Sequence, residues 1–436
     1  MPCCAPSTGP APTRPAGAAA PPDWMARACI DGVPDSALAG ALVFVRADLN
    51  VPLARDGTVL DAERVRRAAA TVDYLTARRA RVVLATHVGR PKGPDPALST
   101  AVLVPELERA LAVGTPVATV GDCVGDRVDA AVAALAPGSV LLLENVRFHP
   151  EETKNDAAFA ERLAGAATLF VGDAFGASHR AHASNEGLAR VMRGRGYPSV
   201  AGLLLRAELA ALGRSLCCPA RPLVAIVGGS KPSTKAAIIA RLSEHADAVA
   251  LVGGLATTFV AADGGAVGAG EVEAAALPAA AATLASARAR GTRILLPVDV
   301  VAAGADGAPP LTVGACAVPA GLAPRDAGPA TIAALTALVA SAGTVVWNGP
   351  LGVFETPPFD AGTRALALAL APLAAAGATT IVGGGHSVAA VNAAGVAAAF
   401  SHVSTGGGAA LELLEGRVLP GVAALDEGDG LKGVCG

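Results

Sequence analysis

The sequence predicts an α/β fold with two doubly wound parallel-sheet lobes, joined by a helix and a hinge. Short apolar runs alternate with amphipathic helical patterns from Leu42 onward, which is typical of a parallel sheet covered by helices on both faces. The same alternation begins again at about residue 222. Glycines and charged residues follow the apolar runs, at the strand ends where open α/β sheets bind ligands.

Length and composition agree with two lobes. Of the 436 residues, 52% are hydrophobic and 16% are charged, so the chain can bury a large core. The net charge of −3 offers no basic field for nucleic acid. No apolar run is both long enough and free enough of charge and glycine to suggest a membrane span. The eight cysteines form no C-x-x-C pair, so we expect mostly free thiols and no zinc site.

The elements of the first lobe follow in order. Its strands are predicted in the runs LVFVRADL, RVVLATH, SVLLLENV and ATLFVGDAF. Helices are predicted in ERVRRAAATVDYLTARR and TAVLVPELERALA, where apolar residues recur at helical spacing. Residues 31–205 therefore form the first lobe. Residues 1–30 are Ala/Pro-rich and read equally as a disordered extension or as a transit segment.

The second lobe, residues 222–405, repeats the pattern. Its strands are predicted in PLVAIVGG, DAVALVGG, RILLPVDVV, GTVVWNGP and ATTIVGGG, with a helix in AAIIARLSEHA. Between the lobes, the segment Ser199–Arg214 predicts a joining helix, and the helix and loop over 206–221 form the connection.

A set of basic residues in the first lobe predicts a site for a small polyanion. Five arginines stand just past a predicted strand or at a helix start, and His87 joins them: Arg46, Arg64, Arg90, Arg147 and Arg180. The planar guanidinium fork binds carboxylate and phosphate oxygens two at a time. We interpret Arg66 and Arg67 as ordinary surface charges. His179 and His182 lack a third ligand at a suitable spacing, so we expect them to shape the loop around Arg180.

Glycine turns in the second lobe predict a phosphate-binding surface. They follow several strands, at Gly228–Gly229, Gly253–Gly254, Gly383–Gly385 and Gly406–Gly408. Glycine permits close backbone approach, and N–H groups at helix starts attract phosphate. Lys231 and Lys235 supply positive charge. The chain has no G-x-x-x-x-G-K-[ST] motif, so it is not a P-loop protein.

The stretch VVWNGPLGVFE at Val345–Glu355 closely resembles the nucleotide loop of the phosphoglycerate kinase family. Other stretches agree in the family's order: RADLNVP at Arg46–Pro52, THVGRP at Thr86–Pro91, ENVRF at Glu144–Phe148, DAFGASHRAH at Asp173–His182, GGSK at Gly228–Lys231 and STGGGAALELLEG at Ser404–Gly416. The resemblance spans about Leu42 to Leu425, and the wording is similar to that of plastid and cyanobacterial members.

The resemblance implies reversible, in-line phosphoryl transfer between ATP and 3-phosphoglycerate on hinge closure, giving 1,3-bisphosphoglycerate and ADP. This reaction belongs to glycolysis, gluconeogenesis or carbon fixation. The resemblance also implies Mg²⁺ carried as Mg-ATP or Mg-ADP, and a monomer without nucleic-acid or membrane partners. It places the protein in the cytoplasm or the chloroplast stroma, and it implies that the tail 411–425 packs back on the first lobe.

The resemblance also assigns roles to residues. It implies that Arg64 and Lys231 act on the transferring group. The implied 3-phosphoglycerate ligands are Asp48, Asn50, Arg64, His87, Arg90, Arg147 and Arg180. The implied nucleotide ligands are Gly229, Lys235, Gly253, Gly254, Asn348, Glu355, Gly384, Gly385, His386 and Ser387.

Two departures from the family pattern lie on the nucleotide side. The family has a Mg²⁺-binding aspartate where this chain has His386, so no metal ligand is predicted there, and imidazole is a poor magnesium ligand. The loop Gly321–Gly328 lacks the family's usual tryptophan near the adenine pocket. The alternative interpretation is therefore a catalytically weakened homologue that binds 3-phosphoglycerate normally and Mg-nucleotide poorly.

Overall fold

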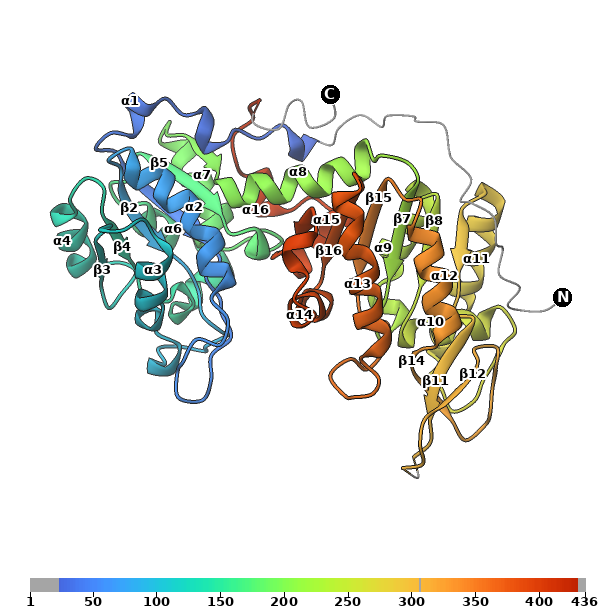
Figure 1. The fold of residues 1–436 in the computed structure, drawn as a ribbon. Helices are drawn as coiled ribbons and strands as arrows, with labels where there is room; N and C mark the ends of the chain where they lie inside the picture. The colour runs from blue at the N-terminus through green and yellow to red at the C-terminus, as the bar shows by residue number, and fades with distance from the viewer. Residues whose placement is uncertain (1–22, 306, 430–436) are drawn as a thin grey trace. The chain divides into compact units, whose positions relative to one another are not determined.

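The computed structural model describes residues 23–305 and 307–429. These residues form two compact units (Figure 1). The N-terminal unit comprises residues 23–210 and 418–429, and the C-terminal unit comprises residues 211–417. Each unit contains a six-stranded parallel sheet, which confirms the predicted fold class.

The sheet of the N-terminal unit has the strand order β3-β4-β2-β1-β5-β6. Its strands are β1 Leu42–Ala47, β2 Arg81–Ala85, β3 Val117–Thr119, β4 Val140–Leu142, β5 Leu169–Asp173 and β6 Ser199–Ala201. In the central strand, Val45 is in register with Leu84 of β2 and Val171 of β5. Every residue of β1 is buried, as expected for a strand covered on both faces.

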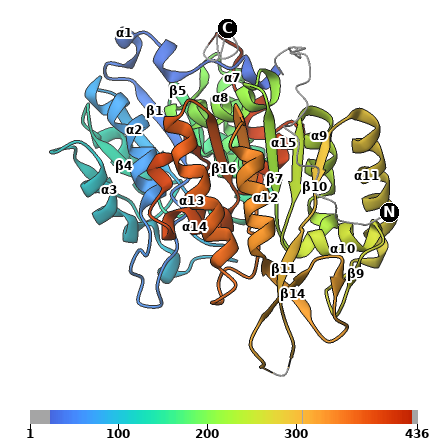
Figure 2. The same ribbon diagram turned by 45° about the vertical axis from the view of Figure 1, so that its right-hand side comes forward.

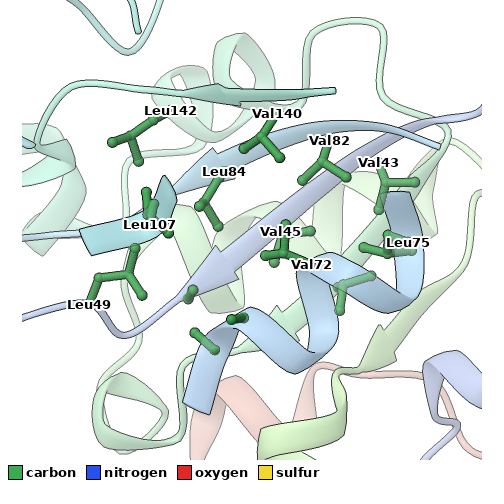
Figure 3. Packing of buried hydrophobic residues seen from close by; sticks show 14 of the residues in the cluster. Val43, Val45, Leu49, Val72, Leu75, Val82, Leu84, Leu107, Val140 and Leu142 are labelled. Atoms are coloured by element: carbon green, nitrogen blue, oxygen red, sulfur yellow. The ribbon is translucent and has the colours of Figure 1, made fainter. Parts of the chain in front are cut away.

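Helices cover both faces of this sheet. Alternate residues of β1, including Val43 and Val45, pack with Val72 and Leu75 of α2 and with Leu107 of α3 (Figure 3). The helices of this unit are α1 Asp35–Leu38, α2 Glu63–Ala77, α3 Val104–Ala110, α4 Asp126–Ala134, α5 Pro150–Lys154, α6 Ala157–Ala164, α7 Leu188–Gly194 and α16 Pro420–Ala423. A short π-helical turn precedes α7 at Ala183–Gly187.

The sheet of the C-terminal unit has the order β10-β8-β7-β15-β16-β17. Its strands are β7 Leu223–Val227, β8 Ala248–Leu251, β10 Arg293–Leu295, β15 Thr344–Asn348, β16 Thr379–Gly383 and β17 His402–Val403. Its helices are α9 Ala236–His245, α10 Gly254–Ala262, α11 Leu277–Arg290, α12 Pro329–Val339, α13 Ala361–Ala375, α14 Gly385–Ala393 and α15 Gly408–Leu414. Trp347 of β15 lies at the centre of the core and is fully buried.

An antiparallel ribbon in this unit differs from the sequence prediction. RILLPVDVV was predicted to be one strand, but it contains β10 of the parallel sheet and, after a break at Pro297, β11 Asp299–Ala303. A three-stranded antiparallel sheet forms from β11, β12 Leu311–Gly314 and β14 Ala323–Ala327. Figure 2 shows β11 and β14 extending away from the parallel sheet. The two-residue strands β9 Ala266–Val267 and β13 Ala317–Val318 form a further pair.

Two other expectations need correction, one on the Ser199–Arg214 segment and one on the tail 411–425. The segment Ser199–Arg214 is not helical throughout, because its first residues pair with β5 as β6 and helix α8 runs over Leu203–Cys217. The division between the units falls within α8, after Ala210, which lies inside the predicted connection 206–221. The tail 411–425 does not pack on the first lobe over its whole length. Helix α15 contacts α9 of the C-terminal unit, and only the residues from Val418 onward belong to the N-terminal unit.

The extension predicted over residues 1–30 falls outside the described residues up to residue 22. Within residues 24–30, Trp24, Met25 and Ile30 are buried, so this part is not a disordered extension. Their apolar side chains join the N-terminal unit, and Arg27 donates to the Leu425 carbonyl. Cys29 and Cys123 are buried free thiols, as predicted, whereas Cys218 and Cys316 take part in disulfides. None of the described helices is long and apolar enough to cross a membrane.

Candidate active site

The strand order places the predicted ligand residues at one edge of each sheet. In the N-terminal unit the chain passes from β1 to β2 on one side and returns to β5 on the other. In the C-terminal unit the chain likewise passes from β7 to β8 on one side and returns to β15 on the other. Loops at the carboxyl ends of such neighbouring strands form the usual binding crevice of open α/β sheets.

In the N-terminal unit, hydrogen bonds join the loops after β1 and β2 to the start of α2. Arg64 Nη1 donates to Asp48 Oδ2 at 2.6 Å, and the Gly89 amide donates to Asn50 Oδ1 at 2.8 Å. Asp48 is buried, whereas about a third of the Arg64 side chain is exposed. The buried carboxylate therefore holds a guanidinium group that still reaches solvent.

Arg147 extends this arrangement to the loop after β4. Its Nη1 donates to the Gly89 carbonyl at 2.7 Å, and its backbone amide donates to Asn145 Oδ1 at 3.1 Å. Burial, together with the positive charges of Arg46 and Arg90, lowers the pKa of Arg147 to about 10. Arginines that disfavour one another's charge are stabilised by a bound anion.

His87 is held as a neutral imidazole by a buried arginine. Arg46 Nη2 lies 3.1 Å from His87 Nδ1. Because a guanidinium can only donate, Nδ1 accepts and the ring proton is on Nε2. Burial and the positive charges of Arg46, Arg147 and Arg64 hold the pKa of His87 well below its usual range. His87 can thus donate one hydrogen bond to an anion without adding charge.

Arg46 itself is a support rather than a ligand residue, in contrast to the position predicted for it just past the strand. It lies inside β1 and is only 1% exposed. Its Nε donates to Ser184 Oγ at 2.8 Å, and Ser184 Oγ donates to Glu152 Oε1 at 2.6 Å. Glu152 is fully buried, and although burial opposes ionisation, His182, Arg46 and Ser184 hold its pKa below the ordinary value. Neither Glu152 nor Ser184 was predicted from the sequence.

The remaining predicted anion ligands lie at the rim. Arg90 and Arg180 are exposed. Arg180 follows β5, and Asn185 Nδ2 donates to its carbonyl at 3.0 Å, which fixes the loop. Contacts among described residues thus bring together Asp48, Asn50, Arg64, His87 and Arg147, with Arg90 and Arg180 on neighbouring loops.

In the C-terminal unit, glycines let the loops after β7, β8 and β15 approach closely. Gly253 has a φ of +70°, and a Cβ there would lie 2.8 Å from the Pro350 carbonyl oxygen. The Gly228 amide donates to the Asn348 carbonyl at 2.8 Å. These loops border a cavity of about 510 Å³. Five predicted nucleotide ligands line it: Gly229, Gly253, Gly254, Glu355 and His386.

The cavity is lined mainly by apolar side chains, with a few polar groups. Val252, Val260 and Val300 are among its lining residues. The strand β14, which contains most of the altered loop Gly321–Gly328, forms another part of the wall. Apolar walls with a few polar groups suit a flat heterocycle such as a nucleotide base.

Lys235 and Asn348 form a pair and are not among the residues that line the cavity. Lys235 Nζ donates to Asn348 Oδ1, and Asn348 is 1% exposed. The Asn348 Nδ2 is buried and has no partner among the described residues. Burial lowers the pKa of Lys235 to about 8, partly offset by Glu415. Ser387 also faces the interior, where its Oγ accepts from the Gly349 amide at 2.6 Å.

Lys231 and the first two residues of α14 occupy exposed positions. Lys231 borders a separate hollow of about 80 Å³ with Thr258 and Glu273. Gly384 has a φ of +90° and precedes α14, whose first residues are Gly385 and His386. The His386 imidazole is exposed, and its Nε2 lies 3.8 Å from Glu355 Oε1.

Together, the two sheets define an α/β protein with an arginine-rich anion site in one unit and a glycine-lined nucleotide-type cavity in the other. This class of architecture suits transfer of a charged group between two separately held substrates.

Comparison with known proteins identifies the family to which the chain belongs. The family model for phosphoglycerate kinase matches residues 33–417, and the chain belongs to this family. It is 50% identical over 405 residues to chloroplastic phosphoglycerate kinase 1 of Arabidopsis thaliana, covering 92% of this chain and 83% of that protein. It is 49% identical over 392 residues to the cytosolic enzyme of Triticum aestivum, covering 89% and 96%.

Solved structures agree with this assignment. The phosphoglycerate kinase structure from Coxiella burnetii superposes with a TM-score of 0.79 at 36% identity, covering 91% of this chain and 98% of that one. The enzyme from Pyrococcus horikoshii superposes with a TM-score of 0.76 at 29% identity, covering 89% and 96%.

Proposed function

We propose that this protein transfers a phosphoryl group reversibly between ATP and 3-phosphoglycerate. The observation that carries the proposal is the contact set around Gly89, which holds Asn50 and Arg147, beside the Asp48–Arg64 pair. Those groups suit a small molecule with a carboxylate, a hydroxyl and a phosphate. Family membership supports the same reaction.

Each unit has its own part in the proposed reaction. The N-terminal unit binds 3-phosphoglycerate, with His87 Nε2–H and the rim arginines on its anionic groups. The C-terminal unit binds the nucleotide, with the base in the cavity of about 510 Å³ and Lys235 near the phosphates. A carboxylate oxygen of the acceptor bonds to the γ-phosphorus while the bond from that phosphorus to the ADP oxygen breaks.

Catalysis then rests on positioning and charge neutralisation, because phosphoryl transfer needs little covalent chemistry from the protein. Arg64 is proposed to neutralise charge on the transferring group. Its guanidinium is oriented by Asp48 at 2.6 Å, so little reorganisation is needed when charge develops. Lys231, which is exposed at the end of the glycine turn after β7, is proposed to guide the same group.

The residues around His386 fit a nucleotide-borne Mg²⁺ only in part. Glu355 is the carboxylate beside His386, at 3.8 Å, and it is also proposed to bind the ribose. Magnesium prefers hard oxygen ligands, so phosphate oxygens and water would supply most of its ligands. When bound, the ion neutralises phosphate charge. We infer that this chain holds Mg-nucleotide more weakly than a variant with an aspartate at this position.

The setting of the reaction is also a proposal. Relatives include both chloroplastic and cytosolic enzymes, so we propose the cytoplasm or the chloroplast stroma. We propose that the protein acts as a monomer. The alternative, a weakened homologue that binds 3-phosphoglycerate without efficient transfer, gains no support from these relatives, which are named as kinases.

The test is steady-state phosphoryl transfer from ATP to 3-phosphoglycerate, titrated with Mg²⁺, for the unmodified protein, His386→Asp and His386→Asn. We expect turnover in the unmodified protein. We expect His386→Asp to lower the Mg²⁺ concentration for half-maximal rate by about 10–100-fold. His386→Asn supplies an oxygen without the charge, so it should show a smaller shift.

The outcomes separate the interpretations. No turnover in the unmodified protein with rescue by His386→Asp would favour the weakened homologue. No turnover in any form would overturn the proposed function. An identical Mg²⁺ dependence in all three forms would overturn the proposed role of residue 386 alone.

A further inference from the structure

Three side chains with metal-binding atoms meet in the N-terminal unit, on the loops that follow β3 and β4. Asp122 and Cys123 lie in the loop between β3 and α4, and His149 follows the turn Val146–Phe148. One ligand atom of each lies within 4.8 Å of the others. Within residues 23–305 and 307–429, this is the group of three or more such side chains that could hold a metal ion.

The surrounding contacts fix two of the three donors. His149 Nε2 lies 2.8 Å from Asp122 Oδ1, and its ring packs against Phe159 with centroids 4.8 Å apart. The Cys123 amide donates to the same Asp122 oxygen at 2.6 Å. The imidazole nitrogen and the carboxylate are therefore aimed at one another before any ion arrives.

The third donor is buried, while the other side of the cluster is open. Cys123 is 2% exposed, and its Sγ donates to the Glu144 carbonyl at 2.9 Å. The side chains of Asp122 and His149 are 50% and 25% exposed. An ion can therefore enter from solvent on the Asp122 side and meet the sulfur at the bottom of the site.

We propose that Asp122, Cys123 and His149 bind one divalent ion of borderline softness, with Zn²⁺ as the best fit, and that water completes the tetrahedron. One thiolate, one imidazole and one carboxylate form a donor set suited to Zn²⁺. Bonds of about 2.0–2.3 Å to zinc place tetrahedral ligands roughly 3–4 Å apart. The 2.8 Å between His149 Nε2 and Asp122 Oδ1 must widen slightly, and separations of up to 4.8 Å must shorten, so small side-chain adjustments suffice.

Charge and protons balance at the proposed site. The thiol loses its proton to solvent as sulfur binds the ion. The Nε2–H of His149, which faces the Asp122 carboxylate in the metal-free protein, also gives up its proton, and the neutral ring that binds through Nε2 carries its one proton on Nδ1. The thiolate and the carboxylate then cancel the two positive charges of the ion. Because Arg147 lies two residues before His149, the ion would also fix the end of the turn that carries this arginine.

The experiment titrates the full-length, metal-free protein with Co²⁺ and then with Zn²⁺. We expect one equivalent of Co²⁺ to give a thiolate-to-cobalt charge-transfer band that one equivalent of Zn²⁺ removes. Cys123→Ser should abolish the band. His149→Gln and Asp122→Asn should weaken binding by more than about 10-fold. Cys29→Ser is the matched control, since Cys29 is another buried free thiol of the same unit, and it should keep the band.

Several results would overturn the proposal. They are the absence of a band and of bound zinc in the unmodified protein, a band that persists in Cys123→Ser, or one lost in Cys29→Ser. If Cys123→Ser fails to fold, unchanged affinity in both His149→Gln and Asp122→Asn would overturn it, because those residues are partly exposed. The readout is metal binding, so the result is independent of the proposed phosphoryl transfer.

Discussion

At the residue scale, the proposed role of Lys235 in nucleotide binding leads to a prediction about pH. Its ammonium group is partly buried beside Asn348, and burial lowers its pKa to about 8. Phosphate binds the protonated form. Affinity that depends on this charge is therefore fully present well below pH 8 and is lost as the pH rises through the pKa of the free protein.

We expect nucleotide affinity to fall by up to about tenfold per pH unit above pH 8. Calorimetric titration with ATP at pH 7, 8 and 9 measures the slope. Lys235→Arg is the control, because arginine stays charged over this range, and its profile should be flat. Equal slopes in the two proteins would show that another group is responsible.

The Asp48–Arg64 pair leads to a second prediction at this scale. Arg64→Ala removes the charge proposed to act on the transferring group, so kcat should fall by about 10²–10³-fold. Arg66→Ala, on the same helix and paired with Glu63 on the exposed surface, should leave kcat unchanged. Steady-state rates at saturating substrate concentrations measure kcat for both variants. Comparable losses of kcat in the two variants would contradict a specific role for Arg64.

Residues that support other residues were the hardest to predict from the sequence. The arginine cluster was visible because arginines recur after apolar runs. Arg46 was grouped with them, although its place inside a fully buried strand makes it a partner of His87 and Ser184. Glu152 escaped notice because its contact with Ser184 joins positions 32 apart. The cluster of Asp122, Cys123 and His149 was not predicted, because these residues form no C-x-x-C pair or similar spacing that indicates a metal site.

At the element scale, the central parallel strands were predictable because burial on both faces forces continuous apolar runs, as in β1, β7 and β15. The antiparallel ribbon was not, since β12 and β14 are largely exposed or partly buried and contain no such run. The Ser199–Arg214 segment shows a related limit. Its first three residues have the composition of a helix start, yet pairing with β5 makes them a strand.

The glycine loops of the C-terminal unit lead to a prediction about stability. Gly253→Ala would place a Cβ 2.8 Å from the Pro350 oxygen and 3.0 Å from the Gly229 oxygen. We expect this overlap to lower the free energy of unfolding by about 1–3 kcal/mol beyond the cost of the positive φ. Gly291→Ala is the reference for a positive φ without overlap, because Gly291 has a φ of +74° and open space around it. Its ψ is 13°, whereas that of Gly253 is −165°, so the cost at Gly253 also includes a larger backbone contribution.

Urea unfolding of the C-terminal unit, followed by the fluorescence of buried Trp347, compares the two variants. Gly291→Ala should cost about 1 kcal/mol, as expected for a left-handed residue that gains a side chain. Equal midpoints for the two variants would mean that the loops separate to accept the methyl group.

At the scale of the whole molecule, the two units have separate cores and separate candidate sites. The core around Val45 contains residues of the N-terminal unit only, and the core around Trp347 contains residues of the C-terminal unit only. A ligand stabilises the state that binds it, by about 2.7 kcal/mol at a concentration 100 times its dissociation constant. Each substrate alone should therefore protect the amides of the unit that binds it.

Hydrogen exchange read by mass spectrometry tests this assignment. With 3-phosphoglycerate we expect slower exchange in peptides from β1, β2 and β4 and the loops that follow them. With ATP we expect slower exchange in peptides from β7, β8 and β15. Arg147→Ala should remove only the first effect, and Lys235→Ala should weaken only the second. If 3-phosphoglycerate protected both units equally in the absence of nucleotide, its binding would have to be coupled to the stability of the C-terminal unit, and the independent assignment of the two substrates would fail.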